Sequence, residues 1–388
     1  MVRINNWGLR STGSKSKDRL HLRSATEVHW SGWKHNRAEN KRLHAVISVL
    51  PTVPNIQLLS LRAAVINKAQ LAIILGLSTL RTLVVESCRF YPSKKPLPLS
   101  HVTALKVSYT EEETIRLLLT LLATTLESLE VDYIGSSTIS YTLQGVLIEL
   151  PKLSTFTTKT AYERTAPSLA TLDTFKRYTS ITTICILYYC KLMGISLHHS
   201  DLPALRSLTC ASWLAMIMIP KRPVTTYVEI GSYQKSGQLA LLNALSNTGA
   251  RITRLTLFVS HNSHSLLPSL ATYLQHLENL TFRSQAMMPR SPQAGMILPK
   301  LKWVTAWVCH NNWASASEWL LKYIIPTCPA LEVLECLGTP NSYYLDFDLP
   351  PKPTLEWRVW RLPGGGWEHP GPLPIPIPCE EIAKTFHG

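Results

Sequence analysis

The stretches LRTLVV (residues 80–85), VTALKV (residues 102–107) and LESLEV (residues 126–131) share the apolar pattern L-x-x-L-x-L, with Val in place of some leucines. Further clear copies begin at Ile56, Ile181, Leu205, Ile252, Leu277 and Leu331, and degraded copies begin at Leu153, Val224 and Leu301. Successive starts from 56 to 331 lie 19–30 residues apart, with a mean of 25. We call this pattern the strand phrase, because alternating apolar residues are typical of a strand that buries one face.

The period predicts a leucine-rich repeat protein, whose units are 20–29 residues long. We therefore expect an α/β fold: a curved solenoid with short parallel strands on its concave side and irregular helices on its convex side. Helical spacing of apolar residues predicts helices over 112–123, 238–245 and 315–325. The second apolar position of each clear phrase should form one buried ladder, made of Leu59, Leu83, Leu105, Leu129, Ile184, Leu208, Leu255, Leu280 and Leu334.

Composition divides the chain into three parts: a basic, disordered tail over 1–20, the solenoid over 21–345, and a C-terminal cap with a proline-rich tail over 346–388. Residues 1–42 carry ten basic and three acidic residues, a net charge of +7, which is half of the formal charge of +14 of the whole chain. This basic segment either contacts an acidic partner or nucleic acid or is a solvated terminus, and we favour the solvated terminus. Nine of the 26 prolines follow residue 349, which favours a packed or disordered tail over a proline-docking ligand.

Catalytic and metal-binding patterns are absent from the sequence. There is no phosphate-binding GxxxxGK[ST] loop, no G-x-S-x-G elbow and no CxxC pair. The close histidine groups are His198–His199 and His261/His264, and the second pair lacks any Cys, Asp or Glu at metal-ligand spacing, so we expect surface histidines there. We predict a binding protein that is not an enzyme and that has no catalytic residue, metal or cofactor.

The N-terminus has no apolar segment of the secretory type, and the most apolar stretch, 181–195, is too short to span a bilayer. We therefore expect an intracellular protein, cytoplasmic or nuclear, without a membrane partner. The usual Asn or Cys after each strand phrase is mostly missing, although Cys88 and Cys309 occupy that position.

The solvent-facing positions of the phrases should supply the partner site. Small hydroxyl residues fill the middle of the chain, while large aromatic residues and arginines, which dominate binding hot spots, gather in the C-terminal third. We predict that an extended or acidic segment of a protein partner is anchored by Arg254, Phe258, Arg283, Trp303 and Trp307. The alternative is that the C-terminal cap or the proline-rich tail folds over Trp303 and Trp307 and buries them.

The segments LPALRSLTC (202–210), LPKLKWVTAW (298–307) and IIPTCPALEVLECLG (324–338) resemble the repeat region of fungal F-box-like proteins, and residues 23–61 are similar to the first repeat after the F-box. The resemblance implies the substrate-recognition part of an F-box-type ubiquitin ligase receptor, with a protein substrate as partner. No F-box is visible before residue 20, so a ligase adaptor is expected as partner only if an F-box lies upstream or in another isoform. The alternative is a free-standing repeat protein with no ligase role, which contacts acidic partners or nucleic acid through its basic N-terminus; nucleic acid is the less favoured partner.

Overall fold

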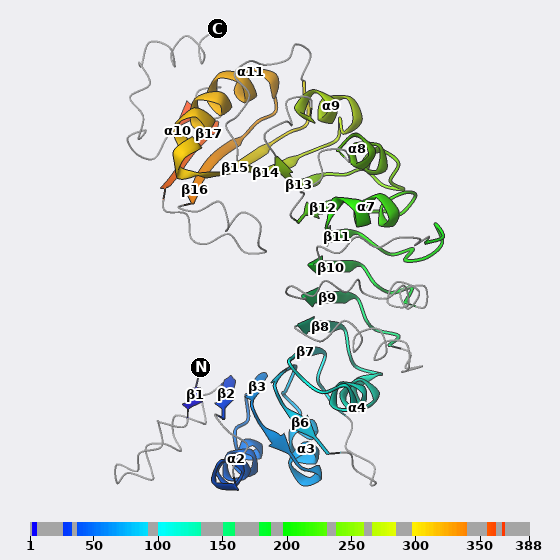
Figure 1. Cartoon of the computed structure of the whole chain (residues 1–388), viewed down its shortest axis with the longest axis vertical. Coiled ribbons are helices and arrows are strands. Elements are labelled where there is room, and N and C mark those ends of the chain that lie inside the picture. Colours follow the sequence, from blue (N-terminus) through cyan, green and yellow to red (C-terminus); the bar gives the residue numbers. More distant parts are fainter. Residues whose placement is uncertain are drawn as a thin grey trace. The chain divides into compact units, whose positions relative to one another are not determined.

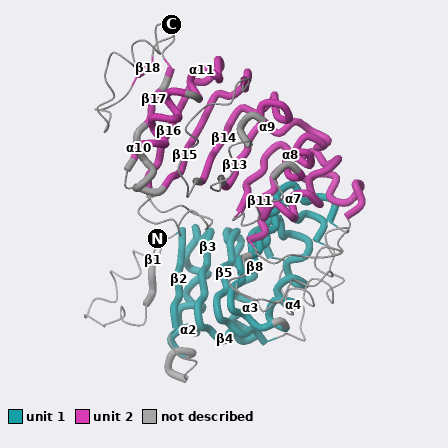
Figure 2. Tube along the Cα trace, turned by 45° about the horizontal axis from the view of Figure 1, so that its top comes forward, with its two compact units in different colours: residues 1–184, 192–195 teal, residues 185–191, 196–388 magenta. Residues whose placement is uncertain are grey.

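The structure is a computed structural model of the 388-residue chain, and it describes residues 2–5, 26–32, 37–91, 100–132, 150–159, 178–187, 197–230, 238–259, 266–284, 297–339, 355–361 and 367–368. The fold is α/β with a large, mostly parallel sheet. The chain forms two compact units, residues 1–184 with 192–195 and residues 185–191 with 196–388, which Figure 2 shows in different colours. Each unit is described by itself below.

Unit 1 contains parallel strands that pair mostly in the order in which they occur in the chain (Figure 1). They are β1 (Val2–Asn5), β2 (Glu27–Ser31), β3 (Leu58–Arg62), β5 (Thr82–Glu86), β7 (Ala104–Ser108), β8 (Ser128–Asp132) and β9 (Thr155–Lys159). The segments between them hold α2 (Arg37–Val49), η1 (Leu50–Thr52), α3 (Lys68–Leu75), α4 (Glu112–Leu122) and a small parallel pair, β4 (Val65–Ile66) with β6 (Arg89–Phe90). The boundary between the units falls within β10 (Thr183–Leu187).

Unit 2 repeats this plan and ends differently. Its parallel strands are β11 (Ser207–Cys210), β12 (Thr226–Glu229), β13 (Arg254–Val259), β14 (Asn279–Ser284), β15 (Trp303–Cys309) and β16 (Val333–Thr339). Its helices are α7 (Ser212–Met218), α8 (Gln238–Ser246), α9 (Leu266–Tyr273), α10 (His310–Trp319), the π-helical turn η2 (Leu320–Ile324) and α11 (Ile325–Thr327). The final strands β17 (Leu355–Arg361) and β18 (Trp367–Glu368) are antiparallel additions after β16, which the repeat pattern did not predict.

Every strand phrase marks a strand with the same offset. Each of the twelve strands begins two residues after the start of its phrase. The phrase starts are residues 56, 80, 102, 126, 153, 181, 205, 224, 252, 277, 301 and 331. The helices expected over 112–123 and 238–245 correspond to α4 and α8, and the third expected helix falls within the run α10, η2 and α11. The phrase therefore locates both the strand and the face that it buries.

One expectation about the N-terminus is wrong. Residues 2–5, assigned to a disordered tail, form β1 and pair in parallel with β2. The physical reason is that Val2 and Ile4 alternate as apolar residues and pair with Val28 and Trp30, which are both buried. Residues 6–20 lie outside the described residues.

The burial predicted for the ladder residues is confirmed, since each of the nine is at most 2% exposed. In unit 1 the register aligns the six core positions Val28, Leu59, Leu83, Leu105, Leu129 and Phe156 across neighbouring strands. In unit 2 it aligns Leu208, Tyr227, Leu255, Leu280, Val304, Leu334 and Val359. None of these side chains is more than 3% exposed, so each unit has a continuous apolar core under its strands.

The turns after three strands of unit 1 share a left-handed residue. Ala63, Ser87 and Tyr109 each stand five residues after the start of their strand and have φ values of 50°, 52° and 50°. The amide of Ala63 donates to the carbonyl of Glu86 at 2.9 Å, and the amide of Ser87 donates to the carbonyl of Ser108 at 2.9 Å. These turns therefore use the otherwise costly left-handed conformation to pair the ends of neighbouring strands.

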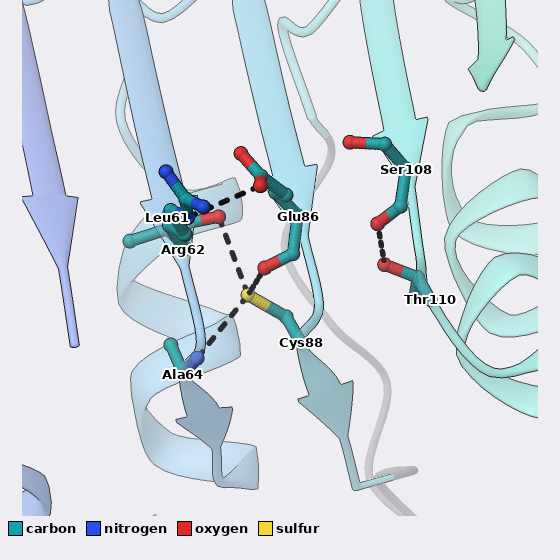
Figure 3. Close-up of polar contacts among 7 residues, drawn as sticks. All are labelled: Leu61, Arg62, Ala64, Glu86, Cys88, Ser108 and Thr110. Atoms are coloured by element: carbon teal, nitrogen blue, oxygen red, sulfur yellow. Dashed lines mark hydrogen bonds and ion pairs between the residues drawn. The ribbon is translucent and has the colours of Figure 1, made fainter. Parts of the chain in front are cut away.

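Cys88 connects two of these turns (Figure 3). Its sulfur accepts a hydrogen bond from the amide of Ala64 at 3.4 Å and lies 3.3 Å from the carbonyl oxygen of Leu61 and 3.2 Å from that of Glu86. Burial raises the pKa of the Cys88 thiol to about 12, so the sulfur is a protonated, structural group at neutral pH. Cys88 thus occupies the position of the usual Asn or Cys and satisfies backbone groups of the neighbouring turn.

A buried arginine closes the turn between α7 and β12. Arg222 is 1% exposed, and its guanidinium donates to the carbonyls of His198, Asp201, Ile217, Met218 and Pro220 at 2.6–3.5 Å. Burial lowers the pKa of Arg222, and the charge of Asp201 acts in the opposite direction. The side chain therefore ties the segment before β11 to the C-terminal end of α7.

We expect Leu83→Ala and Leu280→Ala each to lower the free energy of unfolding by about 2–5 kcal/mol, because each removes buried methyl groups and leaves a cavity. Urea unfolding followed by circular dichroism measures this loss in the full chain. Lys152→Ala, at an exposed turn position, is the control and should change stability by less than about 0.5 kcal/mol. If the leucine variants unfolded at the same urea concentration as the parent, these positions would not carry the core.

Candidate functional site

The candidate site is the outer face of the sheet in unit 2, the face opposite the buried ladder. Residues on this face alternate with the core residues along each strand, and the register places them in three rows across β13 to β17. The first row is Arg254, Asn279, Trp303 and Val333. The middle row is Thr256, Thr281, Thr305, Glu335 and Arg358. The last row is Phe258, Arg283, Trp307, Leu337 and Glu356.

The five residues predicted from the sequence fall in two of these rows. Phe258, Arg283 and Trp307 are direct neighbours in the last row, while Arg254 and Trp303 lie in the first row with Asn279 between them. The structure therefore brings all five onto one sheet face.

Their exposure differs from the expectation. Arg254 is exposed, Trp303 is 38% exposed and Trp307 is partly exposed. Phe258 and Arg283 are only 6% and 8% exposed, so the expectation that they face solvent is wrong. Strands lie about 4.8 Å apart, and large side chains at neighbouring positions of one row shield one another.

A polar cluster fixes the orientation of Trp303. The carboxylate of Glu335 accepts a hydrogen bond from the Trp303 indole Nε1 at 3.2 Å and from the Thr305 hydroxyl at 2.9 Å. The indole Nε1 also lies 3.0 Å from Thr305 Oγ1. The other carboxylate oxygen pairs with the guanidinium of Arg358, which stands 5.9 Å from the centroid of the Trp303 ring. We call Trp303, Thr305, Glu335 and Arg358 the Trp303 cluster.

The Trp303 cluster bears on the alternative in which the C-terminal cap covers the tryptophans. Arg358 belongs to β17 and does contact the Trp303 ring, so the cap takes part. Trp303 nevertheless keeps 38% of its surface exposed. The proline-rich tail from residue 369 lies outside the described residues, and its predicted role is untested.

Sequence reasoning missed Glu335 and Arg358. Glu335 stands at the position held by Thr256, Thr281 and Thr305 on neighbouring strands. A single carboxylate in a row of threonines is a pattern from which the sequence could have singled out Glu335. Arg358 gave no such signal, because its place opposite Glu335 depends on the antiparallel register of β17. That register is not encoded by the repeat period.

The outer face of unit 1 has a different character. Its charged residues pair across neighbouring strands, with 3.1 Å between Arg62 and Glu86 and 2.7 Å between Lys106 and Glu130. Such pairs neutralise each other and contribute little to stability at an exposed surface. On the outer sheet face of the described strands, the Phe and Trp residues lie in unit 2.

One of the two close histidine pairs lies within the described residues. The rings of His198 and His199 lie 4.0 Å apart, and His198 Nδ1 lies 2.8 Å from Ser200 Oγ, while His261 and His264 lie outside the described residues. Within the described ranges, no group of three or more His, Cys, Asp or Glu side chains could hold a metal ion. Over the same ranges, no helix has the length and apolar character needed to cross a membrane.

No protein-family model matches the chain, and a search of curated proteins also found no match.

We expect Glu335→Gln to loosen the Trp303 ring, because the amide cannot pair with Arg358 and accept both the indole and the hydroxyl proton as the carboxylate does. In protein labelled with 5-fluorotryptophan, the Trp303 fluorine resonance, assigned with Trp303→Phe, should shift and change width. The free energy of unfolding should fall by about 1–3 kcal/mol.

Glu356→Gln is the matched control, since Glu356 approaches the same Arg358 only at 3.8 Å and is largely exposed. Its Trp303 resonance should stay in place. Equal shifts in the two variants would show that Glu335 has no special part in holding the ring.

Proposed function

We propose that this chain is a leucine-rich repeat protein, a curved solenoid that binds a protein partner through the outer face of its strands. The constant offset between each strand phrase and its strand supports the repeat assignment, together with a spacing close to 25 residues. In folds of this kind each repeat stacks on its neighbours, and the exposed strand face serves as an extended binding surface. We propose a binding role rather than catalysis.

The observation that carries the proposal is the Trp303 cluster. An indole ring held by Glu335 and Arg358 loses little conformational entropy when a partner packs on it. Tryptophan and arginine are the residues most enriched in binding hot spots. In this proposal Trp303, Arg254 and Trp307 contact the partner, and the buried Phe258 and Arg283 lie beside Trp307 in the last row.

We expect Trp303→Ala to weaken binding of the partner by at least tenfold. The partner is first identified by photo-crosslinking in cells with p-benzoylphenylalanine at Thr281, and affinity is then measured with the purified partner. Tyr273→Ala is the matched control, because Tyr273 of α9 is an aromatic residue in the same unit with the same 38% exposure. Its affinity should stay within twofold of the parent, and equal affinities for both variants would refute the proposed surface.

The resemblance to F-box-like proteins supports a more specific role, in which the bound protein is a substrate presented to a ubiquitin ligase. Under this role we expect the native full-length protein to bind the purified ligase adaptor, with a complex that co-elutes in size-exclusion chromatography. Trp303→Ala should leave adaptor binding unchanged, because the adaptor would be held outside the repeats. A protein that binds its partner through Trp303 but never binds the adaptor would be the free-standing repeat protein.

A further inference from the structure

The turns that lead into β13, β14 and β15 carry basic or imidazole side chains at one repeated position. Arg251, His276 and Lys300 each stand three residues before the first residue of their strand. We call these three residues the basic turn row. At the same position in unit 1 stand Asn55, Thr79, His101, Thr125 and Lys152. His101 and Lys152 are isolated there, so among the described turns a run of three such side chains occurs in this part of unit 2.

The side chains of the basic turn row are close enough to influence one another. Lys300 Nζ lies 3.1 Å from His276 Nδ1, and both Arg251 and Lys300 are exposed. Loss of hydration and the positive charges of Arg251 and Lys300 lower the pKa of His276. The cations of the two flanking turns therefore both disfavour protonation of the His276 imidazole between them.

In each of the three repeats the residue of the basic turn row stands three positions before the residue of the first row. The segments 251–254, 276–279 and 300–303 contain the cations Arg251, Arg254, Lys300 and Lys302, the imidazole of His276 and one carboxylate, that of Glu278. Trp303 stands at the end of this surface and supplies exposed apolar area. A surface with such an excess of positive charge attracts anionic groups and raises their local concentration.

We infer that the basic turn row and the first row of the outer face bind an extended, acidic segment of the protein partner, through its carboxylate or phosphate side chains. This inference rests on the proposed function and adds the chemistry of the partner. Three neighbouring strands span roughly 10 Å, and side chains on one face of an extended chain lie about 6.8 Å apart. The surface therefore accommodates at least two successive anionic side chains, with an apolar neighbour on Trp303.

The test uses short fluorescein-labelled peptides and fluorescence anisotropy with the full chain. The peptides are poly-glutamate, a phosphoserine peptide and a neutral glutamine peptide of the same length. We expect both anionic peptides to bind, with an affinity that falls as salt is added, and the glutamine peptide to bind at least tenfold more weakly. The ratio between the two anionic peptides distinguishes carboxylate from phosphate recognition.

Variants locate the binding. Arg251→Glu and Lys300→Glu should each weaken binding at least tenfold, and the milder Lys300→Gln should weaken it about threefold, as expected for one charge pair at a surface. Lys152→Glu is the matched control, because Lys152 occupies the same turn position before β9, and it should change affinity less than twofold. Circular dichroism verifies that each variant is folded.

A second readout is local to the site. A bound anion favours the protonated imidazole, so the peptide should raise the pKa of His276, followed through its ring proton resonance and assigned with His276→Gln. The inference would be overturned if the anionic peptides still bound the Arg251→Glu and Lys300→Glu variants. It would also be overturned if a single-stranded oligonucleotide bound more tightly than either peptide. If these variants still bind the cross-linked partner normally while Trp303→Ala does not, the inference fails and the proposed function stands.

Discussion

The structure depends on the burial of apolar rows that neighbouring parallel strands share in register. Leu59, Leu83, Leu105 and Leu129 follow one another in unit 1, and each is buried by the strands beside it. Burying one such side chain contributes about 1.5–3 kcal/mol relative to leaving it exposed. Because a strand cannot bury its apolar row alone, the core exists only when neighbours stack, and shifting a strand by one residue would expose the whole row.

The same alternation that fills the core leaves every second residue free to differ. In unit 1 these outer positions carry ion pairs between neighbouring strands, such as Arg62 with Glu86. In unit 2 they carry tryptophans, arginines and threonines, and Glu335 draws Trp303, Thr305 and Arg358 into one cluster. A rigid, partly exposed indole beside a basic surface is suited to a partner with apolar and acidic residues.

Burial of Glu335 has a cost that its partners offset. A carboxylate that is 5% exposed loses most of its hydration, and removing its partners would leave a buried charge. Two hydrogen bonds and the Arg358 guanidinium satisfy it here. Because Arg358 comes from β17, the antiparallel strand that follows the parallel series also shapes the candidate binding face.

The sequence by itself determined the strands, their buried face and the row of candidate residues, because each of these follows from the local spacing of apolar residues. Leu255 and Leu280 were placed in the core, and Arg254 and Trp303 on the opposite face, by alternation alone. The tertiary structure alone decided that Phe258 and Arg283 are shielded, that Glu335 and Arg358 hold Trp303, and that Arg251 and Lys300 both act on His276. These contacts join residues about 25 positions or more apart, and they depend on the register between strands and on side-chain volume, which a repeat period does not specify.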